Sequence, residues 1–262
     1  MNIMAIDIGN TNITTGLFLD GREQFIQSLP GNSVVQLAGL IKSGWEKVPI
    51  VKSSKEKKKD CVIVASSVKP AWTKKIREIL QNELGEKLLL IGDKVPLPME
   101  LAVEEPEKVG TDRVVAAAAA YAVVEDAIVV ADFGTAITID LVDDKGVFLG
   151  GAILPGYEAS ARALKKDTAQ LPKVSMKRPK HPFGRNTREA IQCGLYYSVI
   201  GALEEIVRRY AERIGKWPQV ILTGGGAELI KDDCPFVDDC VPNLVVKGIV
   251  LAYIKYLEER PV

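Results

Sequence analysis

The strongest constraint on the fold is a short unit that occurs twice in the sequence. Asp7-Ile8-Gly9-Asn10-Thr11 and Asp132-Phe133-Gly134-Thr135-Ala136 each stand at the end of an apolar strand-like run and lead into a second one. A third strand-like run and a helical pattern follow each copy. The repeated β-β-β-α order predicts two related α/β domains, which we expect to span residues 1–113 and 114–262.

Periodicity predicts the elements around each copy. In the first half we expect strands over 2–8, 13–19, 23–29, 61–65 and 87–91 and helices over 33–48 and 70–84. In the second half we expect strands over 127–131, 137–142, 147–154 and 218–223 and helices over 110–124, 157–165, 186–215 and 243–259. The last helix is expected to pack on the second domain. The charged stretch 52–60 indicates a solvated loop or the edge of a strand.

Composition excludes several classes of protein. The 34 basic and 34 acidic side chains cancel, so overall charge does not favour nucleic acid or an anionic membrane as a partner. No apolar run approaches the roughly 20 residues of a membrane span, and the first strand turns acidic too soon for a signal peptide. Four scattered cysteines and one histidine do not form a zinc-site pattern. We expect a soluble, cytoplasmic protein with no nucleic acid and no membrane partner.

Both copies of the unit carry residues that suit phosphate binding. The glycine lets main-chain N–H groups approach an anion, hydroxyl or amide side chains add donors, and the aspartate can hold a cation against phosphates. Asp-x-Gly is also typical of a tight turn, in which Asp caps the turn and Gly takes a positive φ. The turn alone would explain either copy. Two copies at matching places, with a third Gly-rich turn at Thr223–Gly226, favour a nucleotide held by phosphate-binding hairpins.

Further motifs match one known family closely. They are Asp7-Ile8-Gly9-Asn10-Thr11-Asn12, Ser66-Ser67-Val68-Lys69-Pro70, Gly110-Thr111-Asp112-Arg113, Asp132 to Ala136 with Thr138 and Asp140, Gly151 to Gly156, Asn186-Thr187-Arg188-Glu189-Ala190 and Thr223-Gly224-Gly225. Along nearly its whole length the sequence resembles type III pantothenate kinase, within the actin-like ATPase and acetate and sugar kinase superfamily. The resemblance implies an α/β fold of two ribonuclease H-like domains with a cleft between them.

The resemblance also implies an activity. It is the ATP-dependent phosphorylation of pantothenate to 4'-phosphopantothenate, the first step of coenzyme A biosynthesis. Mg²⁺, a monovalent cation (K⁺ or NH₄⁺) and a homodimer are implied with it. Two alternatives remain: a non-enzymatic regulator like the Bvg accessory factors, and a kinase of the same superfamily for another small molecule. The intact acidic set of Asp7, Asp112 and Asp132 argues against the regulator.

Roles for single residues follow from the resemblance. Asp112 is the general base that accepts the proton of the attacking hydroxyl. Asp7 lies near the divalent metal, and Asp132 is the ligand of the monovalent cation. The substrate contacts are Gly110, Thr111, Asp112, Arg113 and Thr187. The ATP contacts are Asp7, Ile8, Gly9, Asn10, Thr11, Asn12, Ile13 and Thr14, with Thr135 from the second domain.

Local chemistry offers plainer roles for some of these residues. Thr111 could be a helix N-cap, and the helix dipole would then stabilise Asp112. The dipole and Arg113 would also keep Asp112 ionised, with a low pKa. Either Asn186 or Thr187 could cap a second helix.

Two features fit the resemblance less directly. The family places a Tyr three residues before the Pro of the loop that leads to Gly110, and this chain has Val103 there. Either another group supplies that substrate contact, or the pocket is looser, or the protein has lost pantothenate specificity while it retains the nucleotide site. The loop 173–185 contains five basic side chains and His181, and it could steer ATP or simply be solvated.

Overall fold

The computed structural model describes residues 1–51 and 58–259 and divides into two compact units. Unit 1 comprises Met1–Met99, Glu107–Ala119 and Val245–Val262, and unit 2 comprises Glu100–Pro106 and Ala120–Leu244. The division of the sequence into residues 1–113 and 114–262 stays a prediction. Of the predicted charged loop, residues 52–57 lie outside the described residues.

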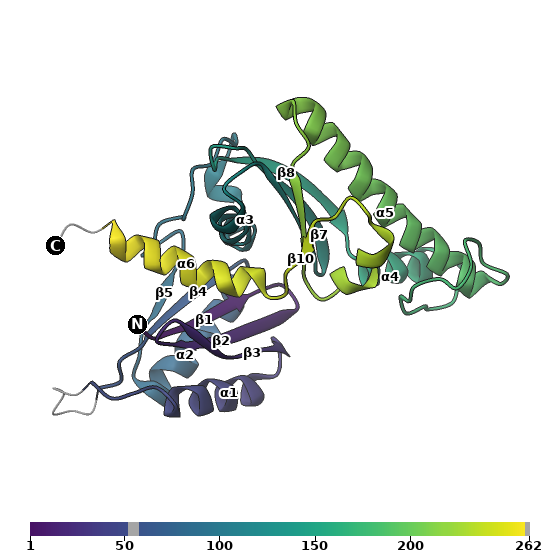
Figure 1. Ribbon diagram of the computed structural model, residues 1–262. Coiled ribbons are helices and arrows are strands. Elements are labelled where there is room, and N and C mark those ends of the chain that lie inside the picture. The colour runs from purple at the N-terminus through teal and green to yellow at the C-terminus, as the bar shows by residue number, and fades with distance from the viewer. Residues whose placement is uncertain (52–57, 260–262) are drawn as a thin grey trace. The chain divides into compact units, whose positions relative to one another are not determined.

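Unit 1 is built on a mixed five-stranded sheet with the strand order β3-β2-β1-β4-β5 (Figure 1). The strands are β1 (Ile3–Ile8), β2 (Asn12–Leu19), β3 (Arg22–Pro30), β4 (Val62–Ser67) and β5 (Leu88–Leu90). The first three form antiparallel pairs, whereas β4 lies parallel to β1 and β5 lies parallel to β4. Hairpins join the antiparallel strands, and the parallel pairs need longer crossover connections.

Helices cover both faces of this sheet, so its central strand β1 is buried. Residues of α1 (Val34–Glu46) and α2 (Pro70–Leu84) share a core with Leu17 and the even-numbered residues of β1. Successive strand residues point to opposite faces, so Gly16 faces away from this core. There it meets α6 (Leu244–Glu258), because a Cβ on Gly16 would lie 2.7 Å from Val246 Cγ1. Figure 1 shows α1 and α6 on opposite sides of the sheet.

The position of α6 corrects the expectation that this helix packs on the second domain. Residues Val245–Val262 belong to unit 1. Gly248 of α6 packs closely on α3 (Thr111–Val124), where a Cβ would fall 2.0 Å from the Val115 carbonyl oxygen. The apolar pattern predicts the helix but not its partner, because both sheets offer an apolar face.

Unit 2 repeats the sheet of unit 1. Its strands are β6 (Ile128–Phe133), β7 (Ala136–Val142), β8 (Phe148–Pro155), β9 (Gln219–Thr223) and β10 (Asp239–Cys240), in the order β10-β9-β6-β7-β8. The β6–β7 and β7–β8 pairs are antiparallel, and the β6–β9 and β9–β10 pairs are parallel. The same order and directions occur in both units, which confirms the predicted repeat.

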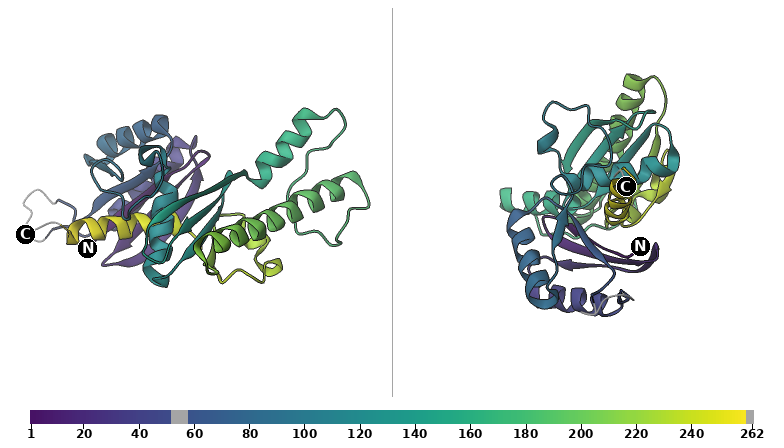
Figure 2. Two further views of the ribbon diagram at one scale, coloured as in Figure 1. Left: turned by 90° about the horizontal axis from the view of Figure 1, so that it is seen from above. Right: turned by 90° about the vertical axis from the view of Figure 1, so that its left-hand side faces the viewer.

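The helix α5 (Thr187–Ile214) covers one face of the second sheet (Figures 1 and 2). Its buried side chains share a core with β6, β7 and β9, namely Tyr196, Leu203 and Val207. The first part of α5 pairs instead with α4 (Tyr157–Asp167) in a small separate cluster of Ile191, Ala161 and Val174. Figure 2 shows α4 and the start of α5 extending beyond the sheet.

The remaining elements are short. The described residues include three 3₁₀ helices, η1 (Pro106–Lys108), η2 (Ala227–Leu229) and η3 (Lys231–Asp233). The predicted helix over 70–84 has those bounds, and the other predicted helices and strands differ by a few residues at their ends. Within residues 1–51 and 58–259, no helix combines the length and the apolar character needed to cross a membrane.

Candidate functional site

The first Asp-x-Gly hairpin lies at the end of β1 in unit 1. The Gly9 N–H donates to the Asn12 carbonyl at 3.1 Å and closes the turn. The Gly31 N–H donates to the Thr11 carbonyl at 3.0 Å, so the turn is also held by the residue that follows β3. Asn10, Thr11 and Asn12 are exposed. The turn thus presents amide and hydroxyl side chains, which can donate to an anion.

Two residues predicted to contact ATP have buried side chains that a nucleotide could not reach. Ile8 and Ile13 pair across the hairpin, and their exposed fractions are 0% and 1%. Their side chains belong to the core that packs against α1 and α2. They anchor the two strand ends, and only their main chain could contact a nucleotide.

Asp7 stands between two hydroxyl residues in the sheet. It pairs directly with Thr14 in β2 and with Ser66 in β4. Directly paired strand residues point their side chains to the same face of a sheet. Carboxylate and hydroxyl oxygens are hard ligands of the kind that Mg²⁺ prefers. The donor set around Asp7 therefore fits the predicted divalent cation.

The helix that carries Asp112 is joined to the same end of the sheet. Thr111 begins α3, and its Oγ1 lies 2.8 Å from Ser66 Oγ. The same Oγ1 accepts a hydrogen bond of 3.3 Å from the Ser67 N–H. Since Ser66 is the direct strand partner of Asp7, the structure brings the segments of Asp7 and Asp112 together.

The cap of α3 is not Thr111, so that alternative is wrong. The Val114 N–H donates to the Gly110 carbonyl at 3.4 Å, which makes Gly110 the residue at the cap position. A Cβ on Gly110 would lie 2.5 Å from Asp112 Oδ1. Gly110 is therefore the residue that allows the Asp112 carboxyl to fold back over the helix start.

Burial raises the pKa of the Asp112 carboxyl above its ordinary value. The Arg113 N–H, which donates to Asp112 Oδ1 at 2.9 Å, and the Arg113 charge lower the pKa by less. The expected low pKa is therefore wrong, because the sequence shows the charged neighbour but not the burial. A carboxylate with a raised pKa is a stronger base, which suits proton acceptance.

The second hairpin, in unit 2, also follows an Asp at the end of a strand, but its turn is one residue shorter than the first. The Gly134 N–H donates to the Ala136 carbonyl at 3.1 Å. Asp132 pairs with Thr138 in β7 and with Thr223 in β9, so it too stands between two hydroxyl residues. These oxygen donors fit a hard cation such as K⁺.

Glycines from two other segments pack against the second hairpin. Gly224 has φ +87°, and a Cβ there would fall 2.3 Å from Asp132 Oδ1. The Gly156 N–H donates to the Thr135 carbonyl at 3.1 Å, and a Cβ on Gly156 would fall 2.6 Å from that oxygen. Thr135 itself is exposed. The Gly-rich turn after β9 is thus a close packing partner of the Asp132 carboxylate.

Thr187 is the first residue of α5 and is exposed. The cap is Asn186, whose Oδ1 accepts a hydrogen bond of 3.0 Å from the Glu189 N–H. Glu189 Oε2 in turn accepts from the Arg185 N–H at 2.8 Å, and this bond is the main cause of a lowered Glu189 pKa. Of the two predicted caps, Asn186 is confirmed. The substrate contact of Thr187 stays a prediction.

The predicted site residues fall into two sets. Asp7–Thr14 and Gly110–Arg113 belong to unit 1, whereas Asp132, Thr135 and Thr187 belong to unit 2. In the described part of the chain, no three His, Cys, Asp or Glu side chains form a group that could hold a metal ion. The cleft between the domains stays a prediction, as do the catalytic, ATP, substrate and metal roles.

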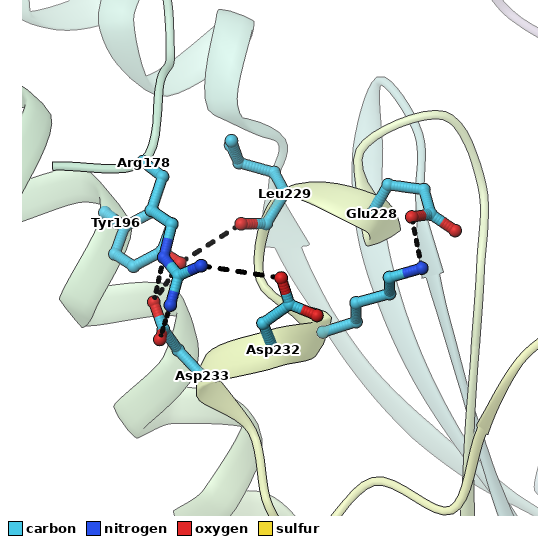
Figure 3. Close-up of polar contacts among 7 residues, drawn as sticks. Arg178, Tyr196, Glu228, Leu229, Asp232 and Asp233 are labelled. Atoms are coloured by element: carbon cyan, nitrogen blue, oxygen red, sulfur yellow. Dashed lines mark hydrogen bonds and ion pairs between the residues drawn. The ribbon is translucent and has the colours of Figure 1, made fainter.

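The basic loop is tied to unit 2 through Arg178 (Figure 3). Arg178 Nε donates to Asp233 Oδ2 at 2.9 Å, and Arg178 Nη1 lies 3.4 Å from Asp232 Oδ2. The Tyr196 hydroxyl of α5 lies 2.5 Å from Asp233 Oδ2 and 3.1 Å from the Leu229 carbonyl. The contacts with Tyr196 and Arg178 lower the pKa of Asp233. At least one of the loop's cations is thus held by acidic side chains.

Val103 lies beside β8 of unit 2. The Phe148 N–H donates to the Glu100 carbonyl and the Ala102 N–H donates to the Phe148 carbonyl, each at 2.9 Å. Val103 is half-buried, and a Cβ on Gly150 would lie 3.6 Å from its Cγ1. The loop that carries the departure from the family pattern is therefore fixed to the sheet.

A cation near the first hairpin was not among the predicted site residues. Lys69 Nζ donates to the Asn10 carbonyl at 2.8 Å, across 59 positions of sequence. The sequence indicates Lys69 only as a member of a matching motif. A contact over such a separation leaves no local pattern from which to predict it.

Sequence comparisons agree with the motif match. The model of the type III pantothenate kinase family matches residues 3–209. A protein described as type III pantothenate kinase from Persephonella marina is 38% identical over 228 residues, which cover 87% of this chain and 89% of the relative. A protein of the same description from Dehalococcoides mccartyi is 32% identical over 256 residues, which cover 96% of each chain.

Solved structures support the fold. A protein described as a Baf family transcriptional activator from Campylobacter jejuni has a TM-score of 0.63 at 19% identity, covering 97% of this chain and 99% of that one. A proposed N-acetylmannosamine kinase from Listeria monocytogenes has a TM-score of 0.52 at 13% identity, covering 99% of each. At such identities the likeness concerns the fold alone. It confirms the predicted α/β fold of two ribonuclease H-like domains.

Proposed function

Because this chain belongs to the type III pantothenate kinase family, we propose that it transfers the γ-phosphoryl group of ATP to the primary hydroxyl of pantothenate. The product is 4'-phosphopantothenate, which enters coenzyme A biosynthesis. The family match over most of the chain carries this proposal. It also favours the kinase over an accessory regulator and over a kinase for another small molecule.

The proton-accepting role is assigned to Asp112. Phosphoryl transfer depends on positioning and on charge neutralisation, and the attacking hydroxyl must lose its proton. Burial raises the pKa of Asp112, so its carboxylate accepts a proton more readily than an exposed one. The Thr111–Ser66 hydrogen bond supports the placement, because it holds the start of α3 beside the strand partner of Asp7. Gly110, Thr111 and Arg113 are assigned to contact pantothenate.

The first hairpin is assigned to the phosphates of ATP, with Asp7 as the carboxylate ligand of Mg²⁺. When bound, Mg²⁺ neutralises the negative charge that develops on the phosphates during transfer. The exposed amide and hydroxyl groups from Asn10 to Asn12 donate to phosphate oxygens. Asp7, which Thr14 and Ser66 flank in the sheet, would hold the cation from the end of β1.

The second hairpin is assigned two roles in unit 2. Asp132, flanked by Thr138 and Thr223, is the proposed ligand of K⁺ or NH₄⁺, and Thr135 is a proposed contact of ATP. A monovalent cation adds positive charge where phosphates crowd. Thr187, at the exposed start of α5, is assigned to pantothenate.

The working state is proposed to be a homodimer in the cytoplasm, without nucleic acid or membrane partners. The dimer rests on family membership alone. Sedimentation equilibrium of the purified chain tests it directly, and a monomer at concentrations that support full activity would remove it from the proposal.

The test of the function is phosphorylation of pantothenate by the purified chain with ATP, with and without K⁺, followed by mass spectrometry of the product. We expect phosphopantothenate, stimulated by K⁺. Asp112→Asn should lower kcat by about 10²–10⁴-fold, the usual contribution of a positioned base. Asp20→Asn, at an exposed turn outside the site with φ 50°, makes the same charge change and should leave kcat unaltered.

Other outcomes identify the alternatives. A folded natural chain that forms no phosphopantothenate contradicts the proposal. Phosphorylation of sugars or hydroxy acids in its place would identify another kinase of the superfamily. Nucleotide-independent binding to DNA or to a regulator, with no kinase activity, would identify the accessory protein.

A further inference from the structure

The first hairpin contains a carboxylate but no cationic side chain. Residues 7–14 read Asp, Ile, Gly, Asn, Thr, Asn, Ile, Thr. The phosphates of ATP are strongly anionic, and proteins commonly place Lys, Arg or a metal ion against them. A cation from another segment would therefore complete the charge balance of this turn.

Lys69 brings a cation to this turn. Its Nζ donates to the Asn10 carbonyl at 2.8 Å. Its main chain is held at both ends, because the Lys69 N–H donates to Ser67 Oγ at 3.2 Å and the Lys69 carbonyl accepts from Thr73 Oγ1 at 3.1 Å. Pro70, the first residue of α2, fixes the backbone that follows. The ammonium thus stands on a rigid connection between β4 and α2.

An aromatic ring limits where the ammonium can go. Lys69 Nζ lies 3.4 Å from the centroid of the Trp72 ring, a cation–π contact. The ring packs so closely on Gly31 that a Cβ there would fall 1.9 Å from Trp72 Cζ3. The Gly31 N–H also donates to the Thr11 carbonyl at 3.0 Å. Ring, glycine and turn therefore form a continuous set of contacts around the Lys69 side chain.

We propose that Lys69 is a phosphate-binding residue of the ATP site. The inference rests on the proposed function, which assigns the first hairpin to the ATP phosphates. An ammonium has three N–H groups, and the Asn10 carbonyl accepts one of them, so Lys69 can stay on the turn while another N–H donates to a phosphate oxygen. Trp72 orders the side chain before the nucleotide arrives, which reduces the entropy lost on binding.

The experiment compares Lys69→Gln, Lys69→Arg and a matched control, Lys75→Gln. Lys75 is exposed on α2, the helix that follows Lys69, and its substitution removes the same charge. The measurements are the KM for ATP, the KM for pantothenate, and the affinity for ADP by calorimetry without turnover. Lys69→Gln should raise the KM for ATP and the Kd for ADP about tenfold, as expected for one charge-assisted hydrogen bond. The KM for pantothenate should change less than about twofold, and Lys69→Arg should keep most of the affinity.

Trp72→Leu tests the role of the ring separately. It keeps the charge of Lys69 and removes the cation–π contact. We therefore expect the Kd for ADP to rise about threefold, which is less than the rise in Lys69→Gln. A thermal melt of each variant establishes that it is folded. If Lys69→Gln does not fold, Lys69→Arg and Trp72→Leu still decide the proposal through the Kd for ADP.

The outcomes separate this inference from the proposed function. An active enzyme whose Lys69→Gln variant keeps the natural Kd for ADP overturns the inference and leaves the function standing. Equal rises in the KM values for ATP and pantothenate, without rescue by Arg, show a structural role and also overturn it. The chain could instead bind ADP in a manner that depends on Lys69 but fail to phosphorylate pantothenate. That result would support the inference and reject pantothenate as the phosphoryl acceptor. If the natural chain binds no ADP, both fail.

Discussion

The pKa of Asp112 differs from the value that its neighbours in the sequence would predict. The neighbouring Arg113 and the start of a helix favour the charged form, yet burial outweighs them and raises the pKa. The sequence predicts the place of Asp112 and its candidate role. It does not predict the pKa, because burial is set by segments distant in sequence.

Activity should reflect this pKa as the pH falls. Only the ionised carboxylate can accept a proton, so kcat/KM should decline on the acid side as Asp112 becomes protonated. Because the pKa is raised, the decline should begin above the value of about 3.9 that is usual for Asp. A pH profile of kcat/KM measures this, with Asp20→Asn as the control that should share the natural profile. An acid limb at or below the ordinary Asp value contradicts the assignment.

Stability should respond to the same pKa with a definite sign. The native state holds the Asp112 proton more tightly than the unfolded state, so this group stabilises the fold below its unfolded pKa, and that contribution is lost as pH rises through the folded pKa. Asn keeps an acceptor for the Arg113 N–H and carries no charge. At about pH 7 we expect Asp112→Asn to be more stable by about 1 kcal/mol, with the difference vanishing in acid.

Urea titrations at the two pH values measure this difference. Asp20→Asn should show no such pH-dependent gain, since Asp20 is exposed. An Asp112→Asn variant that is less stable than the natural chain at neutral pH would show that the carboxylate makes favourable contacts that outweigh its burial.

At the scale of elements, the two hairpins were predictable because their signal is local. Alternating strands, Asp-x-Gly turns and matching positions all lie within short segments of sequence. What surrounds each hairpin was less predictable. The approach of Gly31 and Lys69 to the first turn, and of Gly156 and Gly224 to the second, joins segments that are remote in the chain.

The turn after β9 offers a test of one such approach. Gly224→Ala must place a Cβ against Asp132 Oδ1 at a φ of +87°, so we expect a loss of about 1–3 kcal/mol in stability and a weaker stimulation by K⁺. At the adjacent Gly225 a Cβ would meet nothing within 4 Å, so Gly225→Ala should change stability by less than about 0.5 kcal/mol. Thermal melts and K⁺ titrations of the activity give both quantities. Equal effects of the two variants would mean that the close packing is not what selects glycine.

At the scale of the whole molecule, the repeat predicts the architecture, and family resemblance names it. The assignment of α6 to unit 1 could not be predicted from the sequence. The apolar pattern of an amphipathic helix shows that it packs on something, but it does not identify the sheet on which it packs. The packing of Gly16 on Val246 and of Gly248 on Val115 reveals its partner.

Weakening α6 should therefore loosen unit 1. Val246 is 1% exposed and lies against Gly16 of β2, so Val246→Ala should lower stability by about 1–3 kcal/mol. Hydrogen exchange should speed up in β1 and β2 more than in β6 and β7. Leu257→Ala, at a side chain that is 38% exposed on the same helix, is the control and should change little. Faster exchange confined to unit 2 would contradict the assignment of α6.

The path of the chain through the two units has a consequence for biosynthesis. A ribosome makes the strands of the first hairpin before any of unit 2, but it makes α6 only after all of unit 2 has been synthesised. Domains often fold in the order in which they emerge. Here the sheet of unit 1 emerges first, but one of its faces stays uncovered until α6 has been synthesised. Unit 2, although synthesised later, can complete its fold first, and the sheet that carries Asp7 is the part that a nascent chain must protect from aggregation longest.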